Sequence, residues 1–132
     1  MVKLLLIEDQ EFNRDILTRR LERRHFEVLA ALDGISGLEM AKAHQPDLIL
    51  LDMNLPGMNG WETARQLKSK PETTAIPIIG LSAYSENQAR VKAIEAGCDD
   101  YETKPIDFNA LLDKIQGLAG QTNTKPPTGG PN

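Results

Sequence analysis

The sequence predicts an α/β protein in which a parallel sheet is covered by helices on both faces. Five short apolar runs alternate with amphipathic segments of helical period along the chain. The run Leu48–Leu51 is aliphatic throughout, which is typical of a strand that is buried on both faces. Because parallel strands need crossover connections, usually helices, these observations together predict a doubly wound sheet of five parallel strands.

The five strands are expected where a short apolar run is bounded by charged or turn-forming residues. The third run ends in Asp52 and is followed by a turn-rich segment from Asn54 to Gly60. In chain order, the expected strands cover residues 2–7, 26–30, 47–52, 76–82 and 98–103.

A helix is expected after each strand, and local signals mark several helix ends. Asp33 is suited to cap the second helix at its N-terminus, Pro71 closes the third helix, and Gly97 stops the fourth. The first helix carries an apolar stripe at helical spacing, formed by Phe12, Ile16, Leu17 and Leu21. In chain order, the expected helices cover residues 10–24, 35–43, 61–69, 86–96 and 107–118.

The length of 132 residues is enough for one domain with a core and not for two. The composition changes after Gly120, because residues 121–132 contain three prolines and two glycines but no large apolar residue. Such a segment cannot bury enough surface to offset its ordering entropy. We therefore expect one domain over residues 1–120 and a disordered Pro/Gly-rich tail over residues 121–132.

Charge and apolar content exclude several classes of protein. The net charge of −4 argues against a nucleic-acid-binding surface, which would need a basic face. No apolar run is long enough to span a membrane, and the N-terminus enters a strand without a signal peptide, so a cytoplasmic protein is expected. The single Cys98 excludes an internal disulfide and is expected to be a small buried hydrophobic residue.

Acidic residues stand at the ends of two predicted buried strands. Glu8 and Asp9 follow the first strand, and Asp52 ends the third. Because open parallel sheets bind their ligands at the carboxyl ends of the strands, the three carboxylates should meet at one edge. Like charges gathered there repel one another unless a cation lies among them. The sequence therefore predicts a site for a hard divalent metal, with chemistry at a carboxylate.

Two further polar side chains are expected at the same edge. Ser82 ends the fourth strand, and Lys104 follows the fifth. Carboxylates, a hydroxyl and an ammonium group are the parts that phosphoryl transfer needs, since Mg²⁺ and a lysine together stabilise the charge of the transferred group.

These motifs, in this order and at these strand ends, resemble the response-regulator receiver domains of bacterial two-component signalling. The matching pieces are Glu8-Asp9, the segment Asp52-Met53-Asn54-Leu55-Pro56-Gly57-Met58-Asn59-Gly60, Ser82-Ala83, and Tyr101 three residues before Lys104-Pro105. The resemblance covers residues 2 to about 118. It implies a flavodoxin-like sheet with the strand order 2-1-3-4-5.

The resemblance also implies a role for each acidic residue. Asp52 would be the phosphoacceptor, whose carboxylate attacks the phosphorus of a phosphohistidine and becomes an acyl phosphate. Asp9 and Asp52 would bind Mg²⁺ directly, together with the backbone carbonyl of Asn54. Glu8 would act through a metal-bound water.

Phosphate-binding groups are implied in the same way. Lys104 would pair with Asp52 before phosphorylation and with a phosphate oxygen afterwards, and a cis bond to Pro105 would aim it into the site. Ser82 would donate its hydroxyl to the phosphoryl group, beside the backbone N–H groups of Met53 and Ala83.

The resemblance implies a switch and a control of the lifetime of the phosphoryl group. Ser82 would move toward the phosphoryl group, and Tyr101 would rotate inward to fill the vacated space. The alternative for Tyr101 is a core tyrosine with a solvated hydroxyl. Asn54 and Tyr84 would flank the path of the hydrolytic water.

The partners implied are a histidine kinase or a histidine phosphotransfer protein as donor, docked on Gln10, Asn13, Pro105 and Ile106. A downstream protein is expected on the face formed by the fourth helix, the fifth strand and the fifth helix. The chain is expected to be a monomer, with a dimer left open, and to bind neither nucleic acid nor membrane.

A different class of function is an Mg²⁺-dependent aspartyl-phosphate phosphatase or hydrolase. Such enzymes also use an aspartate at a strand end, but they need a second aspartate two residues later, where this chain has Asn54. The resemblance therefore favours a protein that catalyses only its own phosphorylation and slow dephosphorylation. A nucleotide-binding domain is excluded because no glycine-rich phosphate loop follows any strand.

Overall fold

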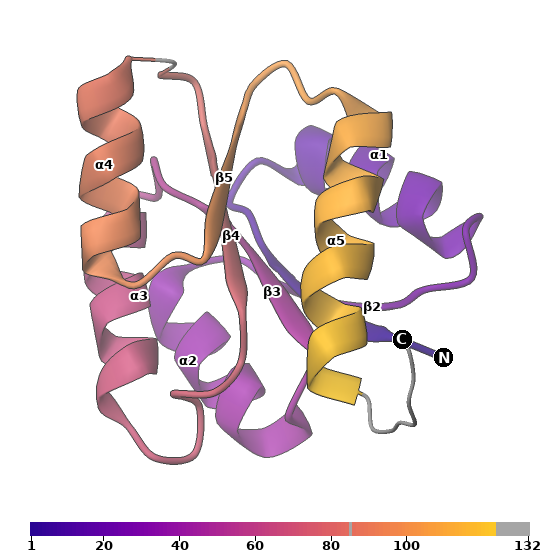
Figure 1. The fold of residues 1–132 in the computed structure, drawn as a ribbon, viewed down its shortest axis with the longest axis horizontal. Helices are drawn as coiled ribbons and strands as arrows, with labels where there is room; N and C mark the ends of the chain where they lie inside the picture. The colour runs from indigo at the N-terminus through magenta and orange to yellow at the C-terminus, as the bar shows by residue number, and fades with distance from the viewer. Residues whose placement is uncertain (85, 124–132) are drawn as a thin grey trace.

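The computed structural model describes residues 1–84 and 86–123 of the chain. The described residues form a parallel five-stranded sheet in the order β2-β1-β3-β4-β5, with helices on both faces (Figure 1). Both the doubly wound architecture and the flavodoxin-like strand order are therefore confirmed. No helix in the described part of the chain is long and apolar enough to cross a membrane.

Most elements begin and end within two residues of their predicted positions. The strands are β1 (Lys3–Ile7), β2 (Glu27–Ala31), β3 (Leu48–Asp52), β4 (Ile78–Ser82) and β5 (Asp100–Thr103). The helices are α1 (Glu11–Glu22), α2 (Gly34–His44), α3 (Gly60–Ser69), α4 (Asn87–Ala96) and α5 (Phe108–Asn123).

The observed helix ends show which local sequence signals correctly predicted where a helix begins or ends. Asp33 caps α2 as expected, because its carboxylate accepts a hydrogen bond from the Ser36 N–H at 2.8 Å. Gly97 ends α4 with a φ of 120°, a backbone conformation that favours glycine. The last helix extends to Asn123, three residues beyond the boundary expected at Gly120, so Gly120 does not stop it. The rest of the expected tail, residues 124–132, lies outside the described residues.

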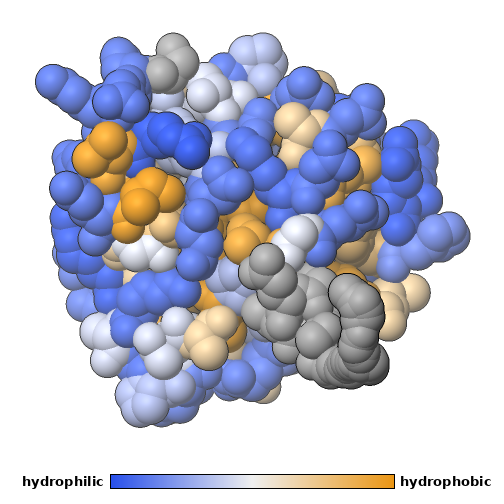
Figure 2. Space-filling view, viewed as in Figure 1, coloured by the Kyte–Doolittle hydropathy of each residue, from blue (hydrophilic) through white to orange (hydrophobic). Residues whose placement is uncertain are grey.

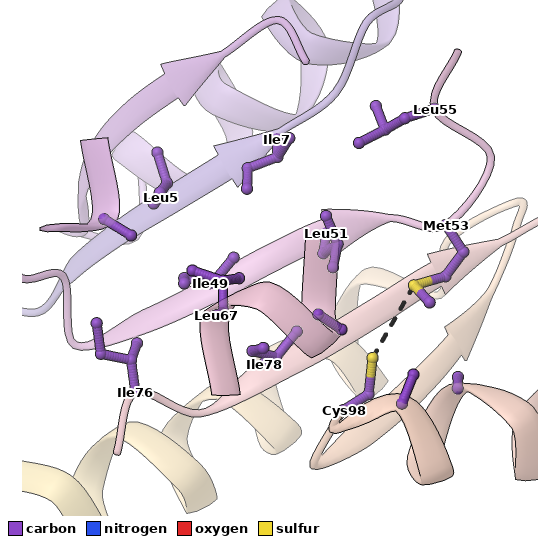
Figure 3. Close-up of a cluster of buried hydrophobic side chains, with 14 of the residues drawn as sticks. Leu5, Ile7, Ile49, Leu51, Met53, Leu55, Leu67, Ile76, Ile78 and Cys98 are labelled. Carbon is purple, nitrogen blue, oxygen red and sulfur yellow. Dashed lines mark hydrogen bonds between the residues drawn. The ribbon is translucent and has the colours of Figure 1, made fainter. Parts of the chain in front are cut away.

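The core consists of two apolar layers, one on each face of the sheet. One layer lies between the sheet and helices α2, α3 and α4, and Figure 3 shows its side chains. The other lies between the sheet and helices α1 and α5. Along β3, Ile49 and Leu51 face the first layer, whereas Leu48 and Leu50 face the second. Each fully buried leucine or isoleucine contributes roughly 1.5–3 kcal/mol to stability, which explains why this strand is aliphatic throughout.

Cys98 is a buried residue of the first layer, as the sequence predicts. Its thiol lies 3.9 Å from the Met53 sulfur, and Figure 3 shows this contact. Burial raises the pKa of the Cys98 thiol to about 12, with a smaller contribution from the charge of Asp99. The thiol is therefore protonated at neutral pH and serves as a packing group.

The apolar stripe of α1 is only partly covered by the core, in contrast to the sequence prediction. Leu21 is buried and Leu17 packs against the second layer, but Phe12 is 74% exposed and Ile16 is 42% exposed. The helical period correctly identifies an apolar face. In the first turns of α1, however, the sheet does not cover that face.

Trp61 joins two helices on the other side of the sheet. It lies in the first turn of α3 and packs against the first layer. The Lys92 ammonium group of α4 lies 4.5 Å from the centre of the Trp61 ring, which is within the range of a cation–π contact.

Candidate functional site

The three acidic residues at the strand ends converge, as the sequence predicts. Glu8, Asp9 and Asp52 each offer a carboxylate oxygen within 4.8 Å of the other two. Their proximity follows from strand pairing, because β1 and β3 are neighbours with Ile7 opposite Leu51. Glu8 and Asp52 are each only 3% exposed, whereas Asp9 is half-buried. Two carboxylates are thus buried side by side at the edge of the sheet.

The burial of neighbouring carboxylates changes the pKa of Glu8. Burial raises the pKa of Glu8 above its usual value, and the charge of Asp52 raises it further. The Gln10 N–H, which donates to Glu8 Oε2 at 3.0 Å, and the Lys104 ammonium act in the opposite direction. An all-oxygen cluster of three carboxylates, whose negative charge a single ammonium group balances only in part, fits a hard divalent cation such as Mg²⁺.

Lys104 places its charge between the two buried carboxylates. Its Nζ lies 3.2 Å from Glu8 Oε1 and 3.6 Å from Asp52 Oδ1. The expected contact with Asp52 is therefore present, but the closer partner is Glu8. The peptide bond between Lys104 and Pro105 is cis, as the resemblance implies.

Asn54, and not Met53, turns its backbone N–H toward the acceptor carboxylate. The Asn54 N–H donates to Asp52 Oδ1 at 2.9 Å. The N–H of Met53 donates at 2.8 Å to the Leu81 carbonyl, which extends the pairing of β3 with β4 by one residue. The Met53 N–H is therefore engaged in strand pairing in this structure, and its binding to a phosphoryl group stays a prediction.

Ser82 and Ala83 lie next to this carboxylate, on the side of β4. The Ser82 hydroxyl is buried and lies 3.4 Å from Asn54 Oδ1, and the Ala83 N–H lies 3.5 Å from the same oxygen. Both contacts are long and hence weak hydrogen bonds. Both donors thus point to the side chain of Asn54, two residues after Asp52.

Tyr101 is linked to the segment that follows Ser82. Its side chain is buried, and its hydroxyl donates to the Tyr84 carbonyl at 2.5 Å. The Tyr84 N–H in turn donates to the Ser82 hydroxyl at 3.1 Å. The structure shows the inward position of Tyr101, and its movement on phosphorylation stays a prediction. The Tyr84 side chain itself is 51% exposed.

Three of the four residues expected at the donor-docking rim line one groove, namely Asn13, Pro105 and Ile106. This groove has a volume of about 580 Å³ and reaches Glu8 and Lys104 at the acidic site. The fourth residue, Gln10, is exposed at the N-cap of α1 but is not part of the groove lining.

Arg14 is a residue of the site that the sequence analysis missed. Its Nη1 donates to the backbone carbonyls of Glu8 at 3.0 Å and of Asp9 at 3.4 Å. It thereby anchors the loop that carries both acidic residues to α1. Its spacing of five and six residues from the acidic pair is the only signal in the sequence, and this spacing is not specific.

Comparison with known proteins finds one family model that matches most of the chain. The family model of the response regulator receiver domain matches residues 4–116. Protein PilH of Pseudomonas aeruginosa is 36% identical over 121 residues, which cover 91% of this chain and 100% of PilH. The chain spans only 52% and 26% of the length of two other curated relatives that it matches.

Solved structures show the same fold. The receiver domain of sensor histidine kinase PA1611 from Pseudomonas aeruginosa, with a magnesium ion coordinated in its active site cleft, has a TM-score of 0.84 and 28% identity. The match covers 90% of this chain and 98% of that one. A chain in the co-crystal of the Saccharomyces cerevisiae histidine phosphotransfer protein Ypd1 with the receiver domain of Ssk1 has a TM-score of 0.86 and 26% identity. That match covers 93% of this chain and 92% of the other.

Proposed function

Because this chain belongs to the response regulator receiver domain family of two-component signalling, we propose that it is a switch that accepts a phosphoryl group from a phosphohistidine on Asp52. The observation that carries this proposal is the position of Asp52. Its buried carboxylate lies close to two further carboxylates and to the ammonium group of Lys104.

The contacts of Asp52 suggest which of its oxygens reacts. The Asn54 N–H and the Lys104 ammonium both contact Oδ1. Among the residues that the structure describes, no hydrogen bond engages Oδ2. In the proposed reaction, Oδ2 forms a bond to phosphorus while the bond between phosphorus and the histidine nitrogen breaks. The electron pair of the broken bond stays on the imidazole, and Asp52 becomes an acyl phosphate.

The remaining residues of the site would bind the metal and the phosphoryl oxygens. Asp9 and Asp52 would hold Mg²⁺ with the Asn54 carbonyl, and Glu8 would act through a water. When bound, the ion supplies positive charge against the negative charge of the phosphoryl group. The acidic cluster supports this assignment, and the similar PA1611 receiver domain is described with magnesium in its cleft.

The phosphoryl oxygens would be bound on the other side by the chain itself. Lys104 supplies a charge, and the Ser82 hydroxyl and the N–H groups of Ala83 and Asn54 supply hydrogen bonds. We propose the Asn54 N–H as an addition to the predicted set, because it is the N–H that reaches the acceptor carboxylate.

We further propose a histidine kinase or histidine phosphotransfer protein as donor and a protein partner for the output. The likeness to a chain in the Ypd1–Ssk1 co-crystal supports the donor. The output surface would be formed by α4, β5 and α5, with Val91 and Ile94 of α4 as exposed apolar residues. Apolar surface over α4 is visible at the left of Figure 2. This switch would act as a monomer in the cytoplasm.

The proposal is tested by incubating the chain with acetyl phosphate and Mg²⁺ and measuring the mass of the intact protein. We expect one added phosphoryl group, which is lost again on mild alkaline treatment because acyl phosphates are labile. The phosphatase alternative predicts instead sustained turnover of p-nitrophenyl phosphate. A receiver should show no such turnover, and the position two residues after Asp52 is Asn54 and not an acidic residue.

Tyr84→Ala is expected to accelerate loss of the phosphoryl group about tenfold, which corresponds to about 1.4 kcal/mol in the barrier. The Tyr84 side chain is half-exposed next to Ser82, and we propose that it covers the phosphoryl group against water. Its backbone contacts to Ser82 and Tyr101 do not need the ring and remain in the variant. The measurement is the decay of labelled protein after removal of acetyl phosphate, at fixed Mg²⁺. Unchanged or slower decay would show that Tyr84 does not guard the site.

A further inference from the structure

A compact basic surface lies at the C-terminal end of α1. It consists of Arg19, Arg20, Arg23 and Arg24, and we call it the arginine patch. All four side chains are exposed, and within the described part of the chain none of them forms an ion pair with a carboxylate. Since the whole protein has a net charge of −4, the patch is a local exception to its acidic character.

Two members of the patch are held in place by an aromatic ring. The guanidinium of Arg20 lies 4.1 Å, and that of Arg24 5.6 Å, from the centre of the Phe108 ring. Phe108 is buried and is the first residue of α5, so this stacking joins α1 to α5. Side chains that are already ordered lose less entropy when a partner binds, and the two arginines are therefore prepared for a contact.

One member of the patch, Arg20, connects it to the phosphorylation site. Arg20 lines the same groove of about 580 Å³ that reaches Glu8 and Lys104. Between these ends, the lining includes the apolar side chains of Ile16, Leu17 and Ile106. From Asn13 to Arg20, α1 rises about 10 Å, which is the length of two turns of a helix that packs along it.

From this geometry, and given the proposed function, we propose that the groove binds a phosphodonor whose docking surface is helical, apolar at its centre and acidic at the end distant from its phosphohistidine. The apolar part contacts Ile16 and its neighbours, and the carboxylates contact the arginine patch. A nucleic acid fits this surface less well, because the groove is apolar and its other end is acidic.

The test uses a histidine phosphotransfer protein as the probe, because the charge of its docking surface can be changed by mutation. Phosphorylated Ypd1 is prepared in two forms that carry either glutamates or lysines on its docking surface, at the end distant from its phosphohistidine. The glutamate form is expected to phosphorylate the wild-type chain at least about tenfold faster than the lysine form. In Arg20→Glu/Arg24→Glu this preference should be inverted, and in Arg20→Gln/Arg24→Gln it should disappear.

A matched control reverses the same number of positive charges on the opposite face of the sheet. Lys42→Glu/Lys70→Glu reverses two exposed lysines on α2 and at the end of α3, which cover the opposite face of the sheet. This control should keep the wild-type preference for the glutamate form. The glutamine pair also serves if the glutamate pair at Arg20 and Arg24 does not fold, as checked by circular dichroism.

Several results would overturn the inference. One is an unchanged preference in both arginine variants, and another is the absence of transfer from either probe while acetyl phosphate still labels the chain. Binding of a DNA duplex that is lost in the arginine variants would assign the patch to nucleic acid instead. Failure of acetyl phosphate to label the wild-type chain is a distinct outcome, because it would reject the proposed function itself.

Discussion

Asp52→Asn is expected to abolish labelling by acetyl phosphate and Mg²⁺ while the fold is retained. The amide has nearly the same shape as the carboxylate, and its oxygen can still accept the hydrogen bond from the Asn54 N–H. Lys104 also keeps its closer partner, Glu8. The amide cannot form an acyl phosphate, so the expected loss is complete.

The measurement is the mass of the intact protein after incubation, with circular dichroism as the test of folding. Asp113→Asn is a suitable control, because this exposed aspartate on α5 undergoes the same chemical change away from the site. Labelling of the Asp52→Asn variant at the wild-type level would reject Asp52 as the acceptor.

Asp9→Ala is expected to remove most of the stabilisation that Mg²⁺ gives to the wild-type protein. At a Mg²⁺ concentration of 100 Kd, binding should stabilise the wild type by about 2.7 kcal/mol. Without Mg²⁺, Asp9→Ala should be more stable than the wild type, because the variant lacks one of three neighbouring negative charges that repel one another. Asp9 is a better choice than Asp52 here, since Asp52 is partly compensated by Lys104.

Thermal unfolding in EDTA and in Mg²⁺ measures both effects. In EDTA the melting temperature of Asp9→Ala should exceed that of the wild type, whereas in Mg²⁺ the wild type should be more stable. Asp113→Ala, which removes an exposed charge from α5, should respond to Mg²⁺ as the wild type does. Equal stabilisation of Asp9→Ala and wild type by Mg²⁺ would contradict the metal site.

The fold was predictable because its central strands are marked by composition alone. A strand that is aliphatic from Leu48 to Leu51 must be buried on both faces, which helices on both sides of a sheet provide. The alternation of strands and helices along the chain then predicts a parallel sheet. The exposed Phe12 and Ile16 show the limit of this reasoning. A helical period reveals that a face is apolar, but it does not reveal whether the sheet or a partner covers it.

The site was predictable at the level of strand ends and not at the level of single atoms. Parallel strands bring Glu8, Asp9 and Asp52 to one edge whatever their side chains do. Which N–H reaches the carboxylate depends on where the pairing of β3 and β4 stops, and that pairing continues through Met53. The contacts of Arg14 and the stacking of Arg20 on Phe108 depend on how loops and helices pack, so residue spacing did not reveal them.

The contact between Trp61 and Lys92 provides the protein with an optical reporter. Trp61 is the only tryptophan of the chain, so all indole emission comes from one place. Its ring lies where α3 meets α4, and the ammonium group of Lys92 is 4.5 Å from its centre. Indole emission depends on nearby charge, so the emission wavelength and the intensity of Trp61 fluorescence should change with the distance between α3 and α4. Trp61 fluorescence can therefore be used to measure a movement of α4 relative to α3 in a chain without an added label.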